Sequence, residues 1–262
     1  MHEASGPRYH SSTLRTHADL HEASALYARV FGYDSPDLQL NTNLLSALVR
    51  NGGSAVGVHT ADGSLVGFAY GFAGRDEHGA EFHYSQAAVV DPAHQGAGVG
   101  RMLKQAQREV ALGWGHGHMR WTFDPSLTRN AHFNLSTLGA EGIGYVADYY
   151  ARPGTDRVVV DWALERSADP YAGARSATPP ALGAQHWGHP LPAPDAGHGA
   201  IWLAAPARAC AADDERPDAD AVVRRALHRL LADGRVLVAS RLVDETTAVH
   251  LAVHRHDGES AG

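Results

Sequence analysis

The fold can be predicted from residues 87–101, which read AAVVDPAHQGAGVGR. The apolar start is typical of a strand, and Gly96, Gly98 and Gly100 predict a tight loop that opens a helix. Small residues let the backbone approach a ligand closely, and a helix N-terminus offers unpaired N–H groups and the positive end of the helix dipole. The segment therefore predicts a binding site for an anion such as a pyrophosphate.

The helix expected after this loop extends to about Gly113 and is amphipathic. Its core-facing residues are expected to be Val99, Met102, Leu103, Ala106 and Val110. Its outward-facing residues near the loop are expected to be Arg101, Lys104 and Arg108.

Two simpler explanations of the glycine loop compete with this one. The first is a plain strand–loop–helix connection. The second is a dinucleotide-binding turn, which requires a parallel β-α-β unit and an acidic residue about 20 positions further on. Residues 114–123 contain no acid, and three strands are expected before the loop. A Walker-type phosphate loop is excluded because no Gly-Lys-Ser/Thr follows.

Around the loop, hydrophobic periodicity and turn signals predict the order β-α-α-β-β-β-α-β-α-β-β. The expected elements are strands at 8–14, SAVGVHT, SLVGFAYGF, 81–90, 119–123, 144–151 and 157–164, and helices at 19–30, 41–50, from the glycine loop to about 113, and 130–138. This order is typical of a mixed α/β sheet flanked by helices in three layers. We expect one domain at 1–166, a Pro/Ala/Gly-rich linker at 167–198, and a small α+β extension at 199–262.

The composition limits the class of protein. A net charge of −7 argues against nucleic acid or an anionic membrane as the main partner, and no apolar run is long enough to span a bilayer. The N-terminus lacks the features of a secretion signal, so we expect a cytoplasmic protein. Cys210 is the only cysteine, which excludes an intramolecular disulfide, and the close histidine pairs lack a nearby third ligand, so we expect no metal.

The motif Gln95-Gly-Ala-Gly-Val-Gly100, preceded by Val90-Asp-Pro92, resembles the acyl-CoA motif of the GNAT superfamily of N-acyltransferases. The resemblance implies a GNAT-like fold over residues 8–165 and acetyl-CoA or succinyl-CoA as acyl donor. It implies that the strand residues Ala88, Val89 and Val90 bond the pantetheine arm. It also implies that the pyrophosphate is held by Gln95, Gly96, Ala97, Gly98, Val99, Gly100 and Arg101.

A narrower resemblance covers residues 121–140, Tyr149-Tyr150 and 155–164. It is to a bacterial GNAT subgroup with a C-terminal extension, linked to N-succinylamino-acid racemase pathways. Members of this subgroup often carry histidines where Tyr84 and Gln86 stand here. We therefore take Tyr84 and Gln86 as the candidate catalytic positions.

The register of the strand before the loop affects this assignment. Because residues alternate along a strand, Tyr84 and Gln86 share a face with Ala88 and Val90 unless a bulge precedes Ala88. His83 is a candidate for the substrate site if the register differs, and a solvated strand histidine is the alternative. The helix tyrosine that many superfamily members use as an acid is absent, since Asn134 and Leu135 stand at that place.

Other candidate residues lie beyond the loop. Asn130 and Asn134 are four apart, so we expect them on one helical face, where they bond the pantetheine or the substrate. The alternative is that Asn130 caps the helix. Asp124 is expected to bind the substrate ammonium or relay its proton, with a strand-end role as the alternative. Arg157 is expected to pair with a substrate or succinyl carboxylate, or else with Asp161, and one of Tyr149 and Tyr150 is expected to line the pocket. We choose Tyr150.

The function expected from these observations is transfer of an acetyl or succinyl group from acyl-CoA to the amine of a small molecule, such as an amino acid. Protein acetylation is a further possibility that the acidic chain disfavours. The alternative from another class is a non-catalytic acyl-CoA-binding sensor or accessory subunit. A homodimer is a further expectation.

Overall fold

The computed structural model describes residues 8–33, 39–207 and 217–256. Contacts group the chain into two units, Met1–Arg120 and Trp121–Gly262. Each unit has buried hydrophobic clusters of its own. Cys210 lies outside the described residues.

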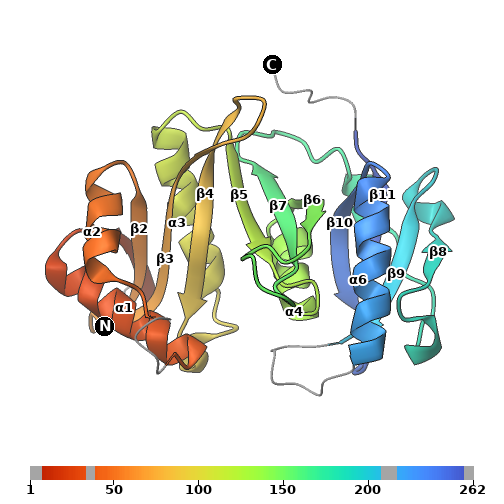
Figure 1. The fold of residues 1–262 in the computed structure, drawn as a ribbon, viewed down its shortest axis with the longest axis horizontal. Helices are drawn as coiled ribbons and strands as arrows, with labels where there is room; N and C mark the ends of the chain where they lie inside the picture. Colours follow the sequence, from red (N-terminus) through yellow and green to blue (C-terminus); the bar gives the residue numbers. More distant parts are fainter. Residues whose placement is uncertain (1–7, 34–38, 208–216, 257–262) are drawn as a thin grey trace, which may run out of the picture. The chain divides into compact units, whose positions relative to one another are not determined.

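The first unit contains the elements expected before and after the glycine loop (Figure 1). They are β1 (Tyr9–Thr13), α1 (His17–Phe31), α2 (Thr42–Arg50), β2 (Ser54–Thr60), β3 (Leu65–Arg75), β4 (Glu81–Val90), α3 (Val99–Gly113) and the start of β5 (His118–Phe123). The strands lie in the order β1-β2-β3-β4-β5. All pairs are antiparallel except β4 with β5, so the sheet is mixed.

Helices cover both faces of this sheet. Leu20 and Leu26 of α1 and Leu45 of α2 pack in one cluster with Phe68 of β3 and Val89 of β4. Val99 and Leu103 of α3 pack in a second cluster with other residues of β2 and β3. The predicted three-layer mixed α/β arrangement is therefore confirmed.

Local sequence signals account for the helix ends. Thr16 and Asp19 form a reciprocal capping box at the start of α1, and Gly32 ends the helix in the left-handed conformation. Asn41 caps α2 with its side-chain oxygen, and the Asn51-Gly52 pair follows its last turn. The helices expected at 19–30 and 41–50 are thus confirmed to within two residues.

Strand β4 contains a bulge, which decides the register question. Tyr70 of β3 pairs with Ala87, whereas the next residue, Gly71, pairs with Ser85, so Gln86 is the extra residue. A Cβ atom on Gly71 would lie 2.3 Å from the carbonyl oxygen of Tyr84, so only glycine fits opposite the bulge. The expectation that Tyr84 shares a face with Ala88 and Val90 is wrong, because the bulge reverses the alternation between them.

The second unit contains the end of β5 and the remaining elements (Figure 1). They are α4 (Thr128–Ala131), a π-helical segment (His132–Thr137), β6 (Glu141–Val146), β7 (Arg157–Ala163), α5 (Ala172–Ser176), β8 (Pro190–Pro192), β9 (Ile201–Pro206), α6 (Pro217–Ala232), β10 (Arg235–Leu242) and β11 (Thr247–His254). The strands of this unit lie in the order β7-β6-β10-β11-β9-β8. The β9–β10–β11 part and α6 form the α+β structure expected in the C-terminal region.

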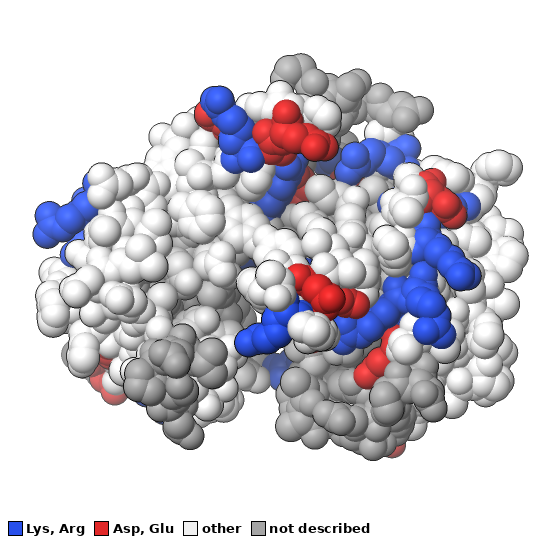
Figure 2. Space-filling model, in the orientation of Figure 1, with Lys and Arg blue, Asp and Glu red and all other residues white. Residues whose placement is uncertain are grey.

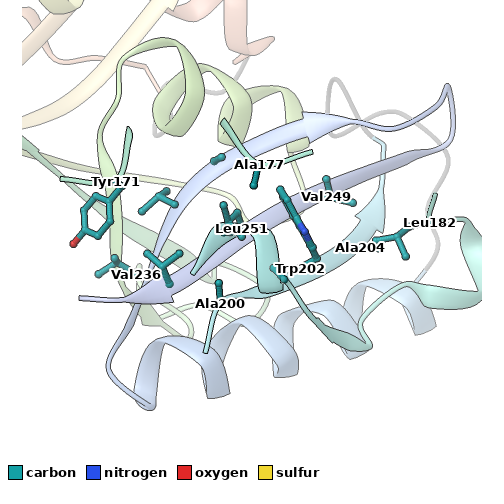
Figure 3. Packing of buried hydrophobic residues seen from close by; sticks show 14 residues of the cluster. Tyr171, Ala177, Leu182, Ala200, Trp202, Ala204, Val236, Val249 and Leu251 are labelled. Atoms are coloured by element: carbon teal, nitrogen blue, oxygen red, sulfur yellow. The ribbon is translucent and has the colours of Figure 1, made fainter. Parts of the chain in front are cut away.

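Residues 167–198, expected to be a linker, contribute to the core of the second unit. Tyr171, Ala177 and Leu182 lie in the same buried cluster as Trp202 of β9 and Leu251 of β11 (Figure 3). The segment also contains α5 and β8. This burial could not be predicted from the sequence, because short irregular segments rich in Pro and Gly show no periodicity that marks a buried face. The domain boundaries at 166 and 198 stay a prediction.

Two elements of the second unit differ from their predicted form. Strand β6 ends at Val146, before the predicted end at residue 151, because Asp148 and Ala151 adopt positive φ in a turn. The carboxylate of Asp156 accepts a hydrogen bond from the Asp148 N–H at 3.0 Å and holds this turn. Tyr149 and Tyr150 therefore lie in the turn, with their rings in edge-to-face contact, and do not alternate on a strand.

The helix expected at 130–138 begins at Thr128 and changes to a π-helix at His132. The Leu138 N–H donates to the carbonyl of Phe133, five residues earlier, at 3.0 Å. Because a π-helix has a wider turn, a spacing of four no longer places two residues on one face. Asn130 is exposed whereas Asn134 is buried, so the expectation of a shared face is wrong.

No helix among the described residues is long and apolar enough to cross a membrane. In that same part of the chain, no group of three or more His, Cys, Asp and Glu side chains is placed to hold a metal ion.

Candidate functional sites

The glycine loop of the first unit joins β4 to α3. Asp91 follows β4, and its carboxylate accepts a hydrogen bond from the Ala93 N–H at 3.0 Å, which lowers the pKa of this carboxyl group. Arg29 forms an ion pair with the same side chain at 3.2 Å. Gly96 and Gly98 follow with φ values of 76° and 86°, a conformation that residues with a Cβ rarely adopt. The loop is therefore fixed at its start and depends on glycine for its path.

The start of α3 has the features of an anion site. Gly98 is the N-cap residue, and it has no side chain to cap the helix. The first intrahelical bond runs from the Met102 N–H to the Gly98 carbonyl at 3.0 Å, so the N–H groups of residues 99–101 lie ahead of it, where an anion is stabilised. The sequence-predicted residues Gln95 to Gly98 are all exposed around this point.

A close approach to the sheet fixes the position of this helix end. A Cβ atom on Gly67 of β3 would lie 2.6 Å from the Cγ1 atom of Val99. Val99 can therefore be fully packed against β3 only because residue 67 is glycine. The helix N-terminus, and with it the loop, has a defined place beside the end of β4.

Lys104 does not face outward, as its helical position had suggested. Its side chain is buried, and its Nζ atom donates to the Oγ atom of Ser85 on β4 at 2.9 Å. The Ser85 hydroxyl in turn donates to Oε1 of Gln107 at 2.8 Å. Burial lowers the pKa of Lys104 to about 7. The prediction was wrong because a long side chain one turn into the helix can reach back over the sheet.

His83 lies in the same buried layer as Lys104. Its Nε2 atom is 2.8 Å from Oγ of Ser54, and its ring stacks on Trp114 with 5.1 Å between the ring centroids. Burial, followed by the charge of Lys104, lowers the pKa of His83 to about 4. These contacts are those of a core histidine, so we assign His83 no part in the proposal for substrate binding below.

Tyr84 and Gln86 lie on either side of Ser85, at the bulge of β4. Both side chains are half-buried, and the Tyr84 ring contacts the ring of Phe72 with 5.4 Å between centroids. Ala88, Val89 and Val90 follow the bulge, where β4 pairs with β3 as far as Val90 and Gly67. Of the two candidate catalytic residues, Tyr84 thus precedes the bulge and Gln86 forms it, whereas Ala88, Val89 and Val90 follow it and lead into the loop.

The second unit brings together three of the sequence-predicted residues. The Asp124 carboxylate lies 3.8 Å from Nη1 of Arg157, and the Arg157 guanidinium lies over the ring of Tyr150, 5.1 Å from its centroid. Asp124 also accepts hydrogen bonds from the N–H and hydroxyl of Ser126 at 2.9 and 2.7 Å. Asp161 is the alternative partner expected for Arg157 from the sequence, but the ion pair in the structure is with Asp124.

Three further residues extend this cluster. Arg224 of α6 lies 3.6 Å from the Asp124 carboxylate and 3.2 Å from the Asp156 carboxylate. Burial lowers the pKa of Arg224, but the two carboxylates raise it by more, so the net shift is upward. The Tyr145 hydroxyl donates a short hydrogen bond to Asp156, and burial together with Asp156 raises the pKa of Tyr145. The result is an alternating array of cations and carboxylates around Asp124.

Sequence analysis missed Arg224, Asp156 and Tyr145. Arg224 lies a hundred residues after Asp124, and no local motif marks it among the other arginines of its helix. Asp156 is adjacent to Arg157 in the sequence, so the Thr-Asp-Arg segment was the one signal available for it.

The two asparagines have different settings. The Oδ1 atom of Asn134 accepts a hydrogen bond from the indole N–H of Trp121 at 3.0 Å. Asn130 is exposed and lies inside α4, which has Leu127 as its N-cap residue, so it does not cap the helix.

The first unit thus combines a mixed α/β sheet with a glycine loop and an uncapped helix start, an arrangement that is typical of anion-binding sites. Residues 19–140 match the family model described as the acetyltransferase (GNAT) family. The matched range contains β4, the loop and α3. This part of the chain is therefore similar to the GNAT acetyltransferase family.

Several solved structures are similar to the chain. Nourseothricin acetyltransferase has 17% identity and a TM-score of 0.46, over 60% of this chain and 99% of that one. The protein yncA from Salmonella typhimurium, named as an acetyltransferase and solved with its cofactor acetyl-CoA, has 18% identity and a TM-score of 0.49, over 62% and 98%. A glucosamine N-acetyltransferase region of a fungal multi-domain β-N-acetylglucosaminidase has 20% identity and a TM-score of 0.38, over 45% of this chain and 14% of that one. The comparison with curated protein sequences gave no match.

Proposed function

We propose that the chain is a CoA-dependent N-acyltransferase that moves an acetyl or succinyl group from acyl-CoA to the amine of a small molecule, with amino acids as the first candidates. The observation that carries this proposal is the loop of the first unit. Gly96 and Gly98 with positive φ and the uncapped start of α3 lie in the segment that matches the GNAT family. In the proposal, residues 95–101 hold the CoA pyrophosphate, and the backbone of Ala88–Val90 bonds the pantetheine arm and polarises the thioester carbonyl.

The cluster around Asp124 supports an amino acid as acceptor. Asp124 supplies a carboxylate for the ammonium group of the acceptor, and Arg157 supplies a guanidinium for the carboxylate of a succinyl donor. The ammonium must lose a proton before it attacks, and we assign Asp124 to hold it and pass the proton to solvent. Tyr84 and Gln86 of the first unit are separate candidate catalytic positions that rest on the sequence resemblance alone. The nitrogen–carbon bond then forms, the carbon–sulfur bond breaks, and CoA leaves as a thiolate that takes a proton from water.

The second candidate is a protein that binds acyl-CoA without turnover. The place of the superfamily's tyrosine acid is held by Asn134, whose side-chain oxygen is engaged by Trp121. No hydroxyl donor at this residue is available to the departing thiolate. Since a thiol with a pKa of about 8.5 leaves readily without help, we favour unassisted departure and catalysis over a purely binding role.

A thiol-release screen separates these proposals. Acetyl-CoA and succinyl-CoA are each incubated with the full chain and a panel of D- and L-amino acids and small amines, and free CoA is measured with a thiol reagent. Amine-dependent release identifies the donor and the acceptor class. Saturable binding of acyl-CoA with no release across the panel would support the non-catalytic protein instead.

A further inference from the structure

The second unit contains a cavity of about 470 Å³ that the functions above do not use. It is bordered by α6, the start of β10 and the β8–β9 region. Its volume falls within the range of about 300–1,000 Å³ that is usual for sites that bind small molecules. The charged and titratable residues that line it are Arg225, Arg229, Asp233, Arg235 and His189.

Two of these arginines stand out because no described residue pairs with them. Arg225 and Arg229 are both exposed and lie one turn apart on the same face of α6, where like charges repel. Among the residues that the structure describes, neither has an ion-pair or hydrogen-bond partner. Their neighbour Arg224, by contrast, is paired with two carboxylates. An anion in the cavity would remove the repulsion between Arg225 and Arg229.

The opposite side of the cavity adds a third cation. Arg235, at the start of β10, donates from Nε to the Gly199 carbonyl at 3.3 Å, and its Nη1 atom lies 3.8 Å from the exposed Asp233 carboxylate. At that distance the ion pair is weak, so Arg235 keeps donors for a ligand. Three guanidiniums and one carboxylate give the lining a net positive charge in a chain of net charge −7. Figure 2 shows arginine side chains, with some acidic side chains among them, over the part of the second unit where α6 lies in Figure 1.

The packing of α6 gives the cavity a defined wall. A Cβ atom on Gly188 would lie 2.3 Å from Cγ1 of Val222, so the turn at Gly188 can approach α6 only with glycine in place. Val222, Leu230 and Ile201 supply apolar lining beneath the charged groups. A site with apolar walls and a few convergent cations suits an organic anion better than a bare inorganic ion.

We propose that this cavity binds a small organic anion with two or more carboxylate or phosphate groups. Guanidinium groups bind both kinds of oxyanion through paired N–H donors. Arg225, Arg229 and Arg235 supply the guanidinium donors for these groups, and Asp233, the one carboxylate in the lining, leaves the net charge of the lining positive. The site is formed by Gly188–Pro190, Ile201, α6 and the start of β10 and does not include the loop at 95–101, so it does not rest on the proposed acyltransferase function.

Calorimetry on the full chain tests the proposal, with citrate as the carboxylate probe and fructose 1,6-bisphosphate as the phosphate probe. The titrations are made at about 0.15 M chloride so that unspecific attraction is screened. The test variant is R225Q/R229Q, and the control is R8Q/R50Q, which removes two exposed arginines of the first unit. We expect at least one probe to bind the wild type and the control equally, and to bind R225Q/R229Q weaker by about tenfold or more, as expected for lost charged hydrogen bonds. The probe that binds more tightly identifies the ligand chemistry.

Two further variants keep the test decisive. R225K/R229K keeps the charge but loses the paired donors, and we expect intermediate affinity, which a folding defect of the glutamine variant would not reproduce. Gly98→Glu should leave binding of the probe unchanged even if CoA binding is lost. No saturable binding of either probe to the wild type, or equal binding by R225Q/R229Q, would overturn the proposal.

Discussion

Arg157 is held loosely for a residue with 20% side-chain exposure. It donates one hydrogen bond, to the Asp156 carbonyl at 2.8 Å, and its ion pair with Asp124 is 3.8 Å long. The remaining guanidinium donors are available for a carboxylate ligand. This setting fits the proposed role of Arg157 toward a succinyl group.

Replacement of Arg157 by Ala should lower succinyl-CoA turnover much more than acetyl-CoA turnover. The expected difference is roughly 2–3 kcal/mol in transition-state stabilisation if the pair is desolvated. Steady-state kcat/KM with both donors measures it, and Arg152→Ala, which removes an exposed arginine of the same turn, is the control. An equal loss with both donors would place Arg157 on the acceptor carboxylate, and no loss would exclude it from the site.

Lys104 makes the stability of the first unit depend on pH. Its pKa of about 7 in the folded chain lies below the ordinary lysine value of 10.5, so between these pH values only the unfolded chain binds the proton. Unfolding then takes up a proton, and stability rises as pH increases. Relative to Lys104→Met, the unfolding free energy of the wild type should rise from pH 7 to 9 by about 1.4 kcal/mol per unit. Urea unfolding at both pH values measures this, and parallel behaviour of the two proteins would show that Lys104 keeps its ordinary pKa.

Residue identity was a good guide in the loop and a poor one for long polar side chains. The positive φ of Gly96 and Gly98 could be expected from the spacing alone, because few other residues tolerate that path. The burial of Lys104 could not, since it depends on Ser85 and Gln107 as partners across the sheet. The two carboxylate contacts of Arg224 likewise exist only after α6 has folded onto the unit.

At the scale of elements, the π-helical segment depends on one arginine. Arg175 of α5 donates to the carbonyls of Leu135, Gly139 and Val238, and its Nε atom lies 2.7 Å from the Asp169 carboxylate. These carbonyls belong to the π-helix, to the second residue after its end and to β10. Arg175 therefore stabilises several elements of the second unit at once.

Replacement of Arg175 by Ala should destabilise this unit by about 1.5–3 kcal/mol, the usual range for hydrogen bonds to a charged group, because the Asp169 carboxylate is exposed whereas the carbonyl partners depend on the guanidinium. Several carbonyls and the Asp169 carboxylate would lose their donor. Urea unfolding followed by circular dichroism measures the loss, and Arg255→Ala, at an exposed position of the same unit, should change stability little. A loss as small as that of the control would mean that water replaces the guanidinium.

Elements with strong periodicity could be predicted, and irregular ones could not. The helices at 17–31 and 42–50 and strands β2 to β4 were found near their predicted bounds. The bulge at Gln86, the π-helix at His132 and the early end of β6 were not, because each depends on pairing with a neighbouring element. These irregular places include four of the candidate site residues: Tyr84, Gln86, Asn134 and Tyr150.

At the scale of the molecule, the C-terminal third is packed into the second unit. β10 pairs with β6 at Leu237 and Gly142, and the Ser240 carbonyl accepts a hydrogen bond from the Ser136 hydroxyl at 2.8 Å. The order of elements as far as residue 165 could be predicted from hydrophobic periodicity. The packing of the C-terminal third into the second unit could not, because residues 167–198 lack a regular pattern.

A chain that ends at Ala168 should therefore lose its stable fold. Removal of β8–β11 and α6 would expose the edge of β6 and leave the π-helix without Ser240 and Arg175. Solubility, the cooperativity of thermal melting and thiol release test this expectation. A truncated chain that is soluble, melts cooperatively and keeps full activity would contradict it.

The central claim is that the loop at 95–101 binds acyl-CoA, and calorimetry of CoA with the wild type and Gly98→Glu tests it most directly. Gly98 has a φ of 86° at the N-cap of α3, so a glutamate there is strained and places a negative charge beside the pyrophosphate. The wild type should bind CoA, and the folded variant should bind it at least about tenfold more weakly, as expected for lost phosphate contacts. Unchanged CoA affinity in a folded Gly98→Glu protein would contradict the account.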